Sequence, residues 1–216
     1  MLAPLTLTRG PAWRNRLALA PLTNLQSHAD GTLSDAEQHW LTMRARGGFG
    51  LVMTCAAHVQ EQGLGFPGQL GVFSDDHLPG LTRLAEALRA EGAVSAVQLH
   101  HAGYRSPREH VPVPVGPSDD PATGSRGLDE DEVAQLAEDF VLAALRAERA
   151  GFDGVELHGA HGYVLAQFLS AEDNRRTDRY GGDLAGRSRL LREVLEGVRR
   201  RCRPDFQVGL RLSPER

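Results

Sequence analysis

Short apolar runs alternate along the chain with longer stretches in which apolar residues recur at helical spacing. The apolar runs cover residues 16–21, 50–56, 93–99, 152–158 and 206–212. Runs of this length that are apolar on both faces are typical of strands buried in a parallel sheet. Helices are expected between them, over residues 34–47, 75–90, 128–151 and 184–203. The pattern therefore predicts an α/β fold built of repeated βα units.

Residue signals between the strands support these elements. Glu37 follows Ser34, and Glu132 follows Asp129, at the spacing of a capping box. Residues 100–128 are rich in proline and glycine and are expected to form a loop. A loop of this length in a compact domain usually covers a functional site.

Composition narrows the class of protein. The chain has 216 residues, of which 41% are hydrophobic, enough for one domain with a core. Its net charge of -4 gives no reason to expect nucleic acid or an anionic membrane as a partner. Cys55 and Cys202 form neither a disulfide framework nor a zinc pattern, and no signal peptide or membrane span is recognisable. We expect a soluble protein of the reducing cytoplasm.

Candidate chemistry is concentrated at the end of the fourth predicted strand. His158, His161 and Tyr163 lie close together where the strand gives way to a turn and a helix. In a barrel of βα units, catalytic side chains lie at the carboxyl ends of the strands. Two imidazoles and a phenol offer hydrogen-bond donors that suit an anionic ligand or a developing oxyanion.

Other interpretations of these side chains remain at this point. A metal site, as in a metal-dependent barrel hydrolase, is disfavoured because zinc needs three or four ligands and no cysteine or carboxylate stands at matching spacing. Either histidine could also be a satisfied core residue, and the tyrosine could simply pack.

The residues around this cluster form a long motif. HGAHGYVLAQFLS, followed by NRRTDRYGG, resembles the signature of the Old Yellow Enzyme family of FMN-dependent ene-reductases, which are NADH:flavin oxidoreductases. Further segments resemble motifs of that family: APLT at 20–23, RARGGFGLVMTCA at 44–56, QLHHAG at 98–103 and GLRLSP at 209–214. The resemblance implies a (β/α)8 TIM-barrel fold, FMN as cofactor and NADPH or NADH as reductant.

The resemblance also assigns residues to the flavin. They are Pro21, Leu22, Thr23, Ala56, Gln98 and Arg211. Thr23 would hydrogen-bond flavin O4, Gln98 would contact the pyrimidine edge, and Arg211 would lie beside N1 and O2, where reduced flavin carries negative charge. From the residues alone, Gln98 could instead be satisfied by water at the barrel rim, and Arg211 could form an ion pair within the barrel.

The activity implied by the resemblance is reduction of the C=C bond of an α,β-unsaturated carbonyl compound. NAD(P)H first reduces FMN, and the enone then enters the same pocket. His158 and His161 would bind its carbonyl oxygen and stabilise the enolate. Flavin N5 would deliver hydride to the β-carbon, and Tyr163 would give a proton to the α-carbon.

The length of the chain leads to a further expectation. A complete barrel has eight strands and about 250 residues, whereas five strands are predicted here. We therefore expect residues 1–216 to be a single FMN-oxidoreductase TIM-barrel domain, its N-terminal part, without the last three βα units or the FMN phosphate site. The alternative is a non-catalytic truncated or split-gene fragment, a structural module that assembles with a complementing C-terminal segment. A homo-oligomer is possible in either case.

One position departs from the family pattern. The family follows QLxHAG with arginine, whereas this chain has Tyr104 and then Arg105. The contact that the family makes from this loop is therefore not assigned to a residue.

Overall fold

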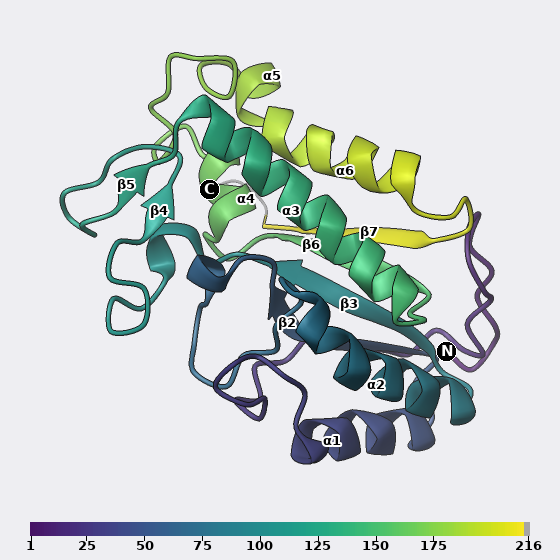
Figure 1. Ribbon diagram of the computed structural model, residues 1–216. Coiled ribbons are helices and arrows are strands. Elements are labelled where there is room, and N and C mark those ends of the chain that lie inside the picture. Colours follow the sequence, from purple (N-terminus) through teal and green to yellow (C-terminus); the bar gives the residue numbers. More distant parts are fainter. Residues whose placement is uncertain (214–216) are drawn as a thin grey trace.

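A single parallel sheet forms the centre of the computed structural model, which describes residues 1–213 (Figure 1). Its strands are β1 (Ala18–Leu19), β2 (Leu51–His58), β3 (Val94–His100), β6 (Gly154–Gly159) and β7 (Gln207–Leu212). They stand in chain order, β1-β2-β3-β6-β7, and every neighbouring pair is parallel. The sheet curls into part of a (β/α)8 barrel, which confirms the predicted fold class.

Helices cover the outer face of this sheet, and most of the loops gather at the carboxyl ends of the strands (Figure 1). The helices are α1 (Asp35–Arg46), α2 (Leu78–Ala90), α3 (Glu130–Arg149), α4 (Val164–Leu169), α5 (Leu184–Arg187) and α6 (Arg189–Arg201). Leu84 of α2, Phe140 of α3 and Val194 of α6 are fully buried in the core that joins helices and sheet. Burying an apolar side chain of this size contributes ~1.5–3 kcal/mol, so this layer holds the sheet in its curved shape.

The helix starts follow the predicted signals with one exception. Asp129 and Glu132 form the expected capping box at α3, each side chain accepting from the other residue's backbone N–H. At α1, Ser34 Oγ accepts from the Glu37 backbone at 3.1 Å, but the Glu37 carboxylate is buried and accepts from the Ser27 hydroxyl. The second capping box is therefore only half formed, because Glu37 is used in the interior.

Some elements differ in extent from the prediction. β1 is shorter than residues 16–21, because only Ala18 and Leu19 pair with β2. The helix expected over residues 184–203 is divided at Ser188, which ends α5 and precedes α6. The expected loop over residues 100–128 contains a small two-stranded sheet, β4 (Val115–Gly116) and β5 (Arg126–Gly127).

The N-terminal segment lies across the end of the sheet opposite to the carboxyl ends of the strands. Leu5 bridges to Trp13 in a hairpin, and Trp13 Nε1 donates to Gln207 Oε1, at the start of β7, at 3.2 Å. A cavity of about 470 Å³ lies between this hairpin and the concave face of the sheet. At the edge strand β7, Leu210 and Leu212 are exposed, so this edge presents apolar side chains to solvent.

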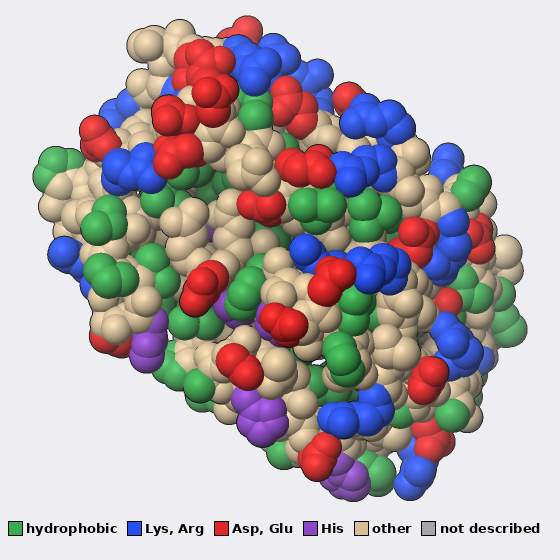
Figure 2. Space-filling view, viewed as in Figure 1, with side chains coloured by type: hydrophobic (Ala, Val, Ile, Leu, Met, Phe, Trp, Pro, Cys, Tyr) green, Lys and Arg blue, Asp and Glu red, His purple; other side chains and the backbone are tan. Residues whose placement is uncertain are grey.

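Acidic and basic side chains are interspersed over the helix-covered face (Figure 2). Ion pairs such as Arg201–Glu138 and Arg146–Asp75 join neighbouring elements there. No field of a single sign extends over the face shown, in keeping with the small net charge. In the part of the chain that the structure describes, no helix combines the length and the apolar character needed to cross a membrane.

Candidate active site

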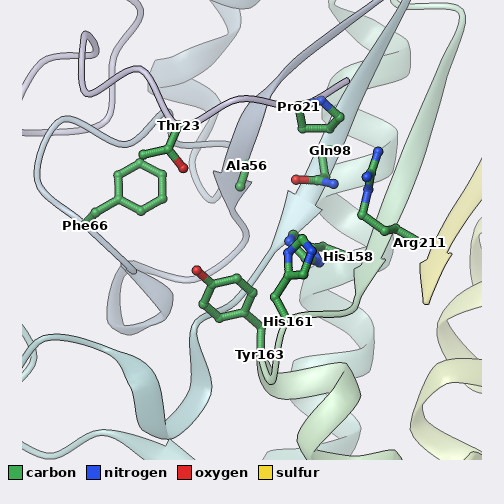
Figure 3. Close-up of a pocket in the computed structure, with 9 residues that line it drawn as sticks. All are labelled: Pro21, Thr23, Ala56, Phe66, Gln98, His158, His161, Tyr163 and Arg211. Carbon is green, nitrogen blue, oxygen red and sulfur yellow. The ribbon is translucent and has the colours of Figure 1, made fainter. Parts of the chain in front are cut away.

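A pocket lies at the carboxyl ends of the parallel strands (Figure 3). It is lined by Pro21, Thr23, Ala56, Phe66, Gln98, His158, His161, Tyr163 and Arg211. Every residue that the sequence analysis singled out for the flavin or the substrate lies in this wall except Leu22, whose side chain is 50% exposed. The fold thus brings together side chains that are up to about two hundred residues apart in the sequence.

The register of the sheet explains why these side chains meet. Ala56 on β2 pairs with Gln98 on β3, which in turn pairs with Glu156 on β6. His158, two residues further along β6, pairs with Arg211 on β7. Because side chains alternate between the two faces of a strand, these positions share the concave face of the sheet. A slip of one residue would turn a strand's pocket side chains towards the helices.

Glu156 is a site residue that the sequence analysis missed. Its Oε1 accepts hydrogen bonds from Gln98 Nε2 at 2.7 Å and from Arg211 Nε at 2.9 Å. Gln98 thus contacts a carboxylate, and Arg211 forms the ion pair within the barrel that its sequence position also allowed. A carboxylate can only accept, so Gln98 presents its amide nitrogen to Glu156, and within residues 1–213 its Oε1 remains available to accept from a ligand. The signal in the sequence was a charged residue inside an apolar strand.

His158 is neutral at neutral pH. Burial, together with His161 and Arg211, lowers the pKa of His158 to about 4. The Ala160 backbone N–H donates to His158 Nδ1 at 3.4 Å. Nδ1 is therefore the unprotonated nitrogen, and Nε2 carries the hydrogen. His158 offers the pocket one hydrogen-bond donor and no positive charge.

His161 has a left-handed backbone conformation, with a φ of 59°. Residues other than glycine adopt this region rarely, at a cost on the order of 1–3 kcal/mol. The residue is held on both sides, since its N–H donates to Ser213 Oγ at 2.9 Å and its carbonyl accepts from Arg105 Nη1 at 2.8 Å. This turn leads to Tyr163, which stands at the start of α4. A strained turn that places two pocket side chains is typical of a functional site.

The aromatic rings of the site pack edge to face (Figure 3). The ring of His158 lies 5.0 Å from that of His161 and 5.1 Å from that of Tyr163, between centroids. Behind them, the His100 ring lies 4.3 Å from Tyr163. His100 Nδ1 is bound to Gln69 Nε2, and within residues 1–213 its buried Nε2 has no hydrogen-bond partner. The phenol and the two imidazoles thus lie in mutual contact at the end of β6.

A loop residue completes the pocket. Phe66 lines it from the glycine-rich loop after β2, and an aromatic residue among glycines was its only signal in the sequence. At the position where the family has arginine, Tyr104 Oη donates to Asp173 Oδ1 at 3.3 Å. The next residue, Arg105, is the one that reaches His161.

Within residues 1–213, no group of three or more histidine, cysteine or acidic side chains is arranged to hold a metal ion.

Comparisons with known proteins point to one family. The sequence profile of the NADH:flavin oxidoreductase / NADH oxidase family matches residues 1–216. The chain is 43% identical to the probable NADH-dependent flavin oxidoreductase YqiG of Bacillus subtilis, over 98% of this chain and 59% of that protein. It is 39% identical to an NADPH dehydrogenase of Halalkalibacterium halodurans, over 89% of this chain and 57% of that protein.

A solved structure gives the same result. The old yellow enzyme homologue from Zymomonas mobilis superposes with a TM-score of 0.90 and 31% sequence identity, over 99% of this chain and 63% of that chain. The chain spans about three fifths of the length of these relatives. The resemblance inferred from the motifs is confirmed.

Proposed function

The chain belongs to the NADH:flavin oxidoreductase / NADH oxidase family, and on that premise we propose that it acts in an FMN-dependent reduction of activated C=C bonds by NADPH or NADH. One observation carries the proposal: Gln98 and Arg211, both bound to Glu156, share a pocket with the imidazole and phenol donors of β6 and the turn after it. We propose further that residues 1–216 form one domain of the barrel type.

The donor set fits the pyrimidine edge of a flavin, which presents alternating donors and acceptors. Gln98 Oε1 is free to accept, and the Arg211 guanidinium keeps N–H groups beyond the one bound to Glu156. Pro21, Thr23 and Ala56 would face the same ring system. The cavity has a volume of about 110 Å³, below the ~300 Å³ at which pockets for larger ligands begin, so it would enclose only part of a flavin ring.

FMN, when bound, would supply the hydride chemistry. The residues of the chain would orient the substrate and manage charge and protons. His158 Nε2–H and a ring nitrogen of His161 would donate to the carbonyl oxygen of an α,β-unsaturated compound and stabilise the negative charge that develops there. Tyr163, held against His158, would provide the proton for the α-carbon.

Binding of FMN and of riboflavin to the purified chain tests this proposal, with flavin absorbance and fluorescence as readouts. We expect both flavins to bind, since the ring contacts do not involve the phosphate. Gln98→Ala should weaken both by about three- to tenfold, the value of one buried hydrogen bond. Gln135→Ala, at an exposed position on α3, is the matched control and should bind like the wild type. Absence of flavin binding, or equal affinities in all three proteins, would overturn the proposal.

A further inference from the structure

Arg105 lies beside the pocket and has no carboxylate partner among the residues that the structure describes. The other pocket arginine, Arg211, is paired with Glu156 at 2.9 Å. Within residues 1–213, no acidic side chain forms an ion pair with Arg105, and its side chain is exposed. His158 adds no charge, because burial lowers its pKa to about 4. Arg105 therefore adds a positive charge beside the pocket that no carboxylate within residues 1–213 offsets.

The guanidinium of Arg105 is nevertheless fixed in place. Nη1 donates to the His161 carbonyl at 2.8 Å, and Cζ lies 5.5 Å from the centre of the Tyr163 ring. Both neighbours line the pocket. The hydrogen bond uses one of five N–H groups, and the remaining donors make no hydrogen bond within the described residues. A planar guanidinium with free donors is suited to bind a carboxylate through two parallel hydrogen bonds.

We propose that Arg105 is a specificity-determining residue that makes the pocket select substrates carrying a carboxylate close to the activated C=C bond. The inference rests on the proposed function, which places the reacting carbonyl at His158 and His161. Arg105 contacts the His161 carbonyl and the Tyr163 ring, so an anion held by its remaining donors would lie beside the molecule that Tyr163 protonates. The substrate class is therefore a small unsaturated carbonyl compound that also carries a carboxylate.

A pair of ligands of the same shape isolates the charge. 4-Hydroxybenzoate and 4-hydroxybenzamide share the phenol expected to face His158 and His161, and they differ in a carboxylate against a neutral amide. We expect the wild type to bind the benzoate more tightly than the amide. Arg105→Gln should weaken the benzoate by about tenfold, the value of a charge-assisted hydrogen bond, and change the amide by less than about twofold. Arg105→Lys keeps the charge but loses the planar pair of N–H donors. Its affinity for the benzoate should lie between those of the wild type and Arg105→Gln.

Arg108→Gln is the matched control. Arg108 is an exposed arginine of the same loop and lies against Gly124 rather than against the pocket. It should leave both affinities unchanged. Binding is measured with FMN present, by the change in flavin absorbance, and without flavin, by ligand-observed NMR.

The outcomes separate the two proposals. Failure of FMN to bind would overturn the proposed function, while the NMR measurement on the flavin-free chain still decides the role of Arg105. An equal loss of both ligands in Arg105→Gln would show that Arg105 only positions the His161 turn, and would overturn carboxylate selection. Equal affinities of wild type and Arg105→Gln for the benzoate in both measurements would overturn it as well.

Discussion

Arg211, which lines the pocket, forms an ion pair with Glu156, its Nε donating to Glu156 Oε1 at 2.9 Å. The same oxygen accepts from Gln98 Nε2 at 2.7 Å. One carboxylate oxygen therefore sets the direction of both side chains and offsets the charge of the guanidinium. Glu156 lies on β6 and Arg211 on β7, so their contact depends on the pairing of these two strands.

Replacing Glu156 with glutamine should raise the reduction potential of bound flavin. The change keeps the shape of the side chain but leaves the Arg211 charge without its counter-charge, which favours the more negative reduced flavin. If loss of the Glu156 charge stabilises the reduced flavin by about 1–3 kcal/mol, the reduction potential should rise by ~20–60 mV. Equilibration with a redox dye measures this potential. Glu138→Gln, which removes a carboxylate paired with Arg201 on the surface, should leave the potential unchanged. A potential unaltered in Glu156→Gln would contradict the proposed proximity of Arg211 to the flavin.

Tyr163→Phe should slow the half-reaction in which an enone reoxidises the flavin, by about 10²–10⁴-fold. The reduction of the flavin by NADPH needs no proton from the phenol and should be nearly intact. Stopped-flow absorbance separates the two half-reactions. Tyr180→Phe removes a hydroxyl bound to Glu193, outside the pocket, and serves as the control. An equal loss in both half-reactions of Tyr163→Phe would show that Tyr163 is not the proton donor.

The double variant His158→Ala and His161→Ala should weaken the binding of phenolate-like ligands by at least about a hundredfold. Each imidazole is expected to donate one hydrogen bond to the anionic oxygen, and such bonds are worth ~1.5–3 kcal/mol each. Titration of the charge-transfer absorbance between ligand and flavin measures the affinity. His110→Ala, at an exposed position, is the control. Titrations that match the wild type would argue against the oxyanion role of these histidines.

The free energy of unfolding should fall steeply as the pH drops from about 6.5 towards 4. Burial lowers the pKa of His58 and His158 to about 4 and that of His101 to about 3, and places that of His100 well below its usual value. Above pH ~6.5 these residues are neutral in both states; below it the unfolded chain binds protons that the folded chain does not. Each histidine lowers stability by up to ~1.4 kcal/mol per pH unit in this range.

Urea unfolding between pH 5 and 7.5 measures this slope. The Gly103 backbone N–H donates to His101 Nδ1 at 2.9 Å. Protonation of His101 would put a hydrogen on Nδ1 and replace this hydrogen bond with two donors that face each other. His101→Gln should therefore make the slope shallower, whereas His110→Gln, at an exposed position, should not change it. A flat profile in the wild type would be inconsistent with buried neutral histidines.

Much of the fold followed from local patterns. Apolar runs and capping signals such as Asp129 with Glu132 depend on neighbouring residues, and the structure has them where they were expected. The exceptions arise where a side chain is used over a long distance. The Glu37 side chain does not complete the capping box because its carboxylate accepts from Ser27 and Cys55 in the interior. β1 is shorter than predicted because only two of its residues pair with β2.

The sequence by itself determined the chemistry available to this protein: two imidazoles and a phenol at one strand end, an amide and an arginine at others, and motifs long enough to indicate the family. The tertiary structure decided which of these groups touch. Only the parallel register aligns Glu156 with Gln98 and places Arg211 beside it, and only the loop packing sets Arg105 on the His161 carbonyl while Leu22 stays outside the pocket. Contacts between distant residues depend on how strands pair and turns pack, and neither has a local signature in the chain.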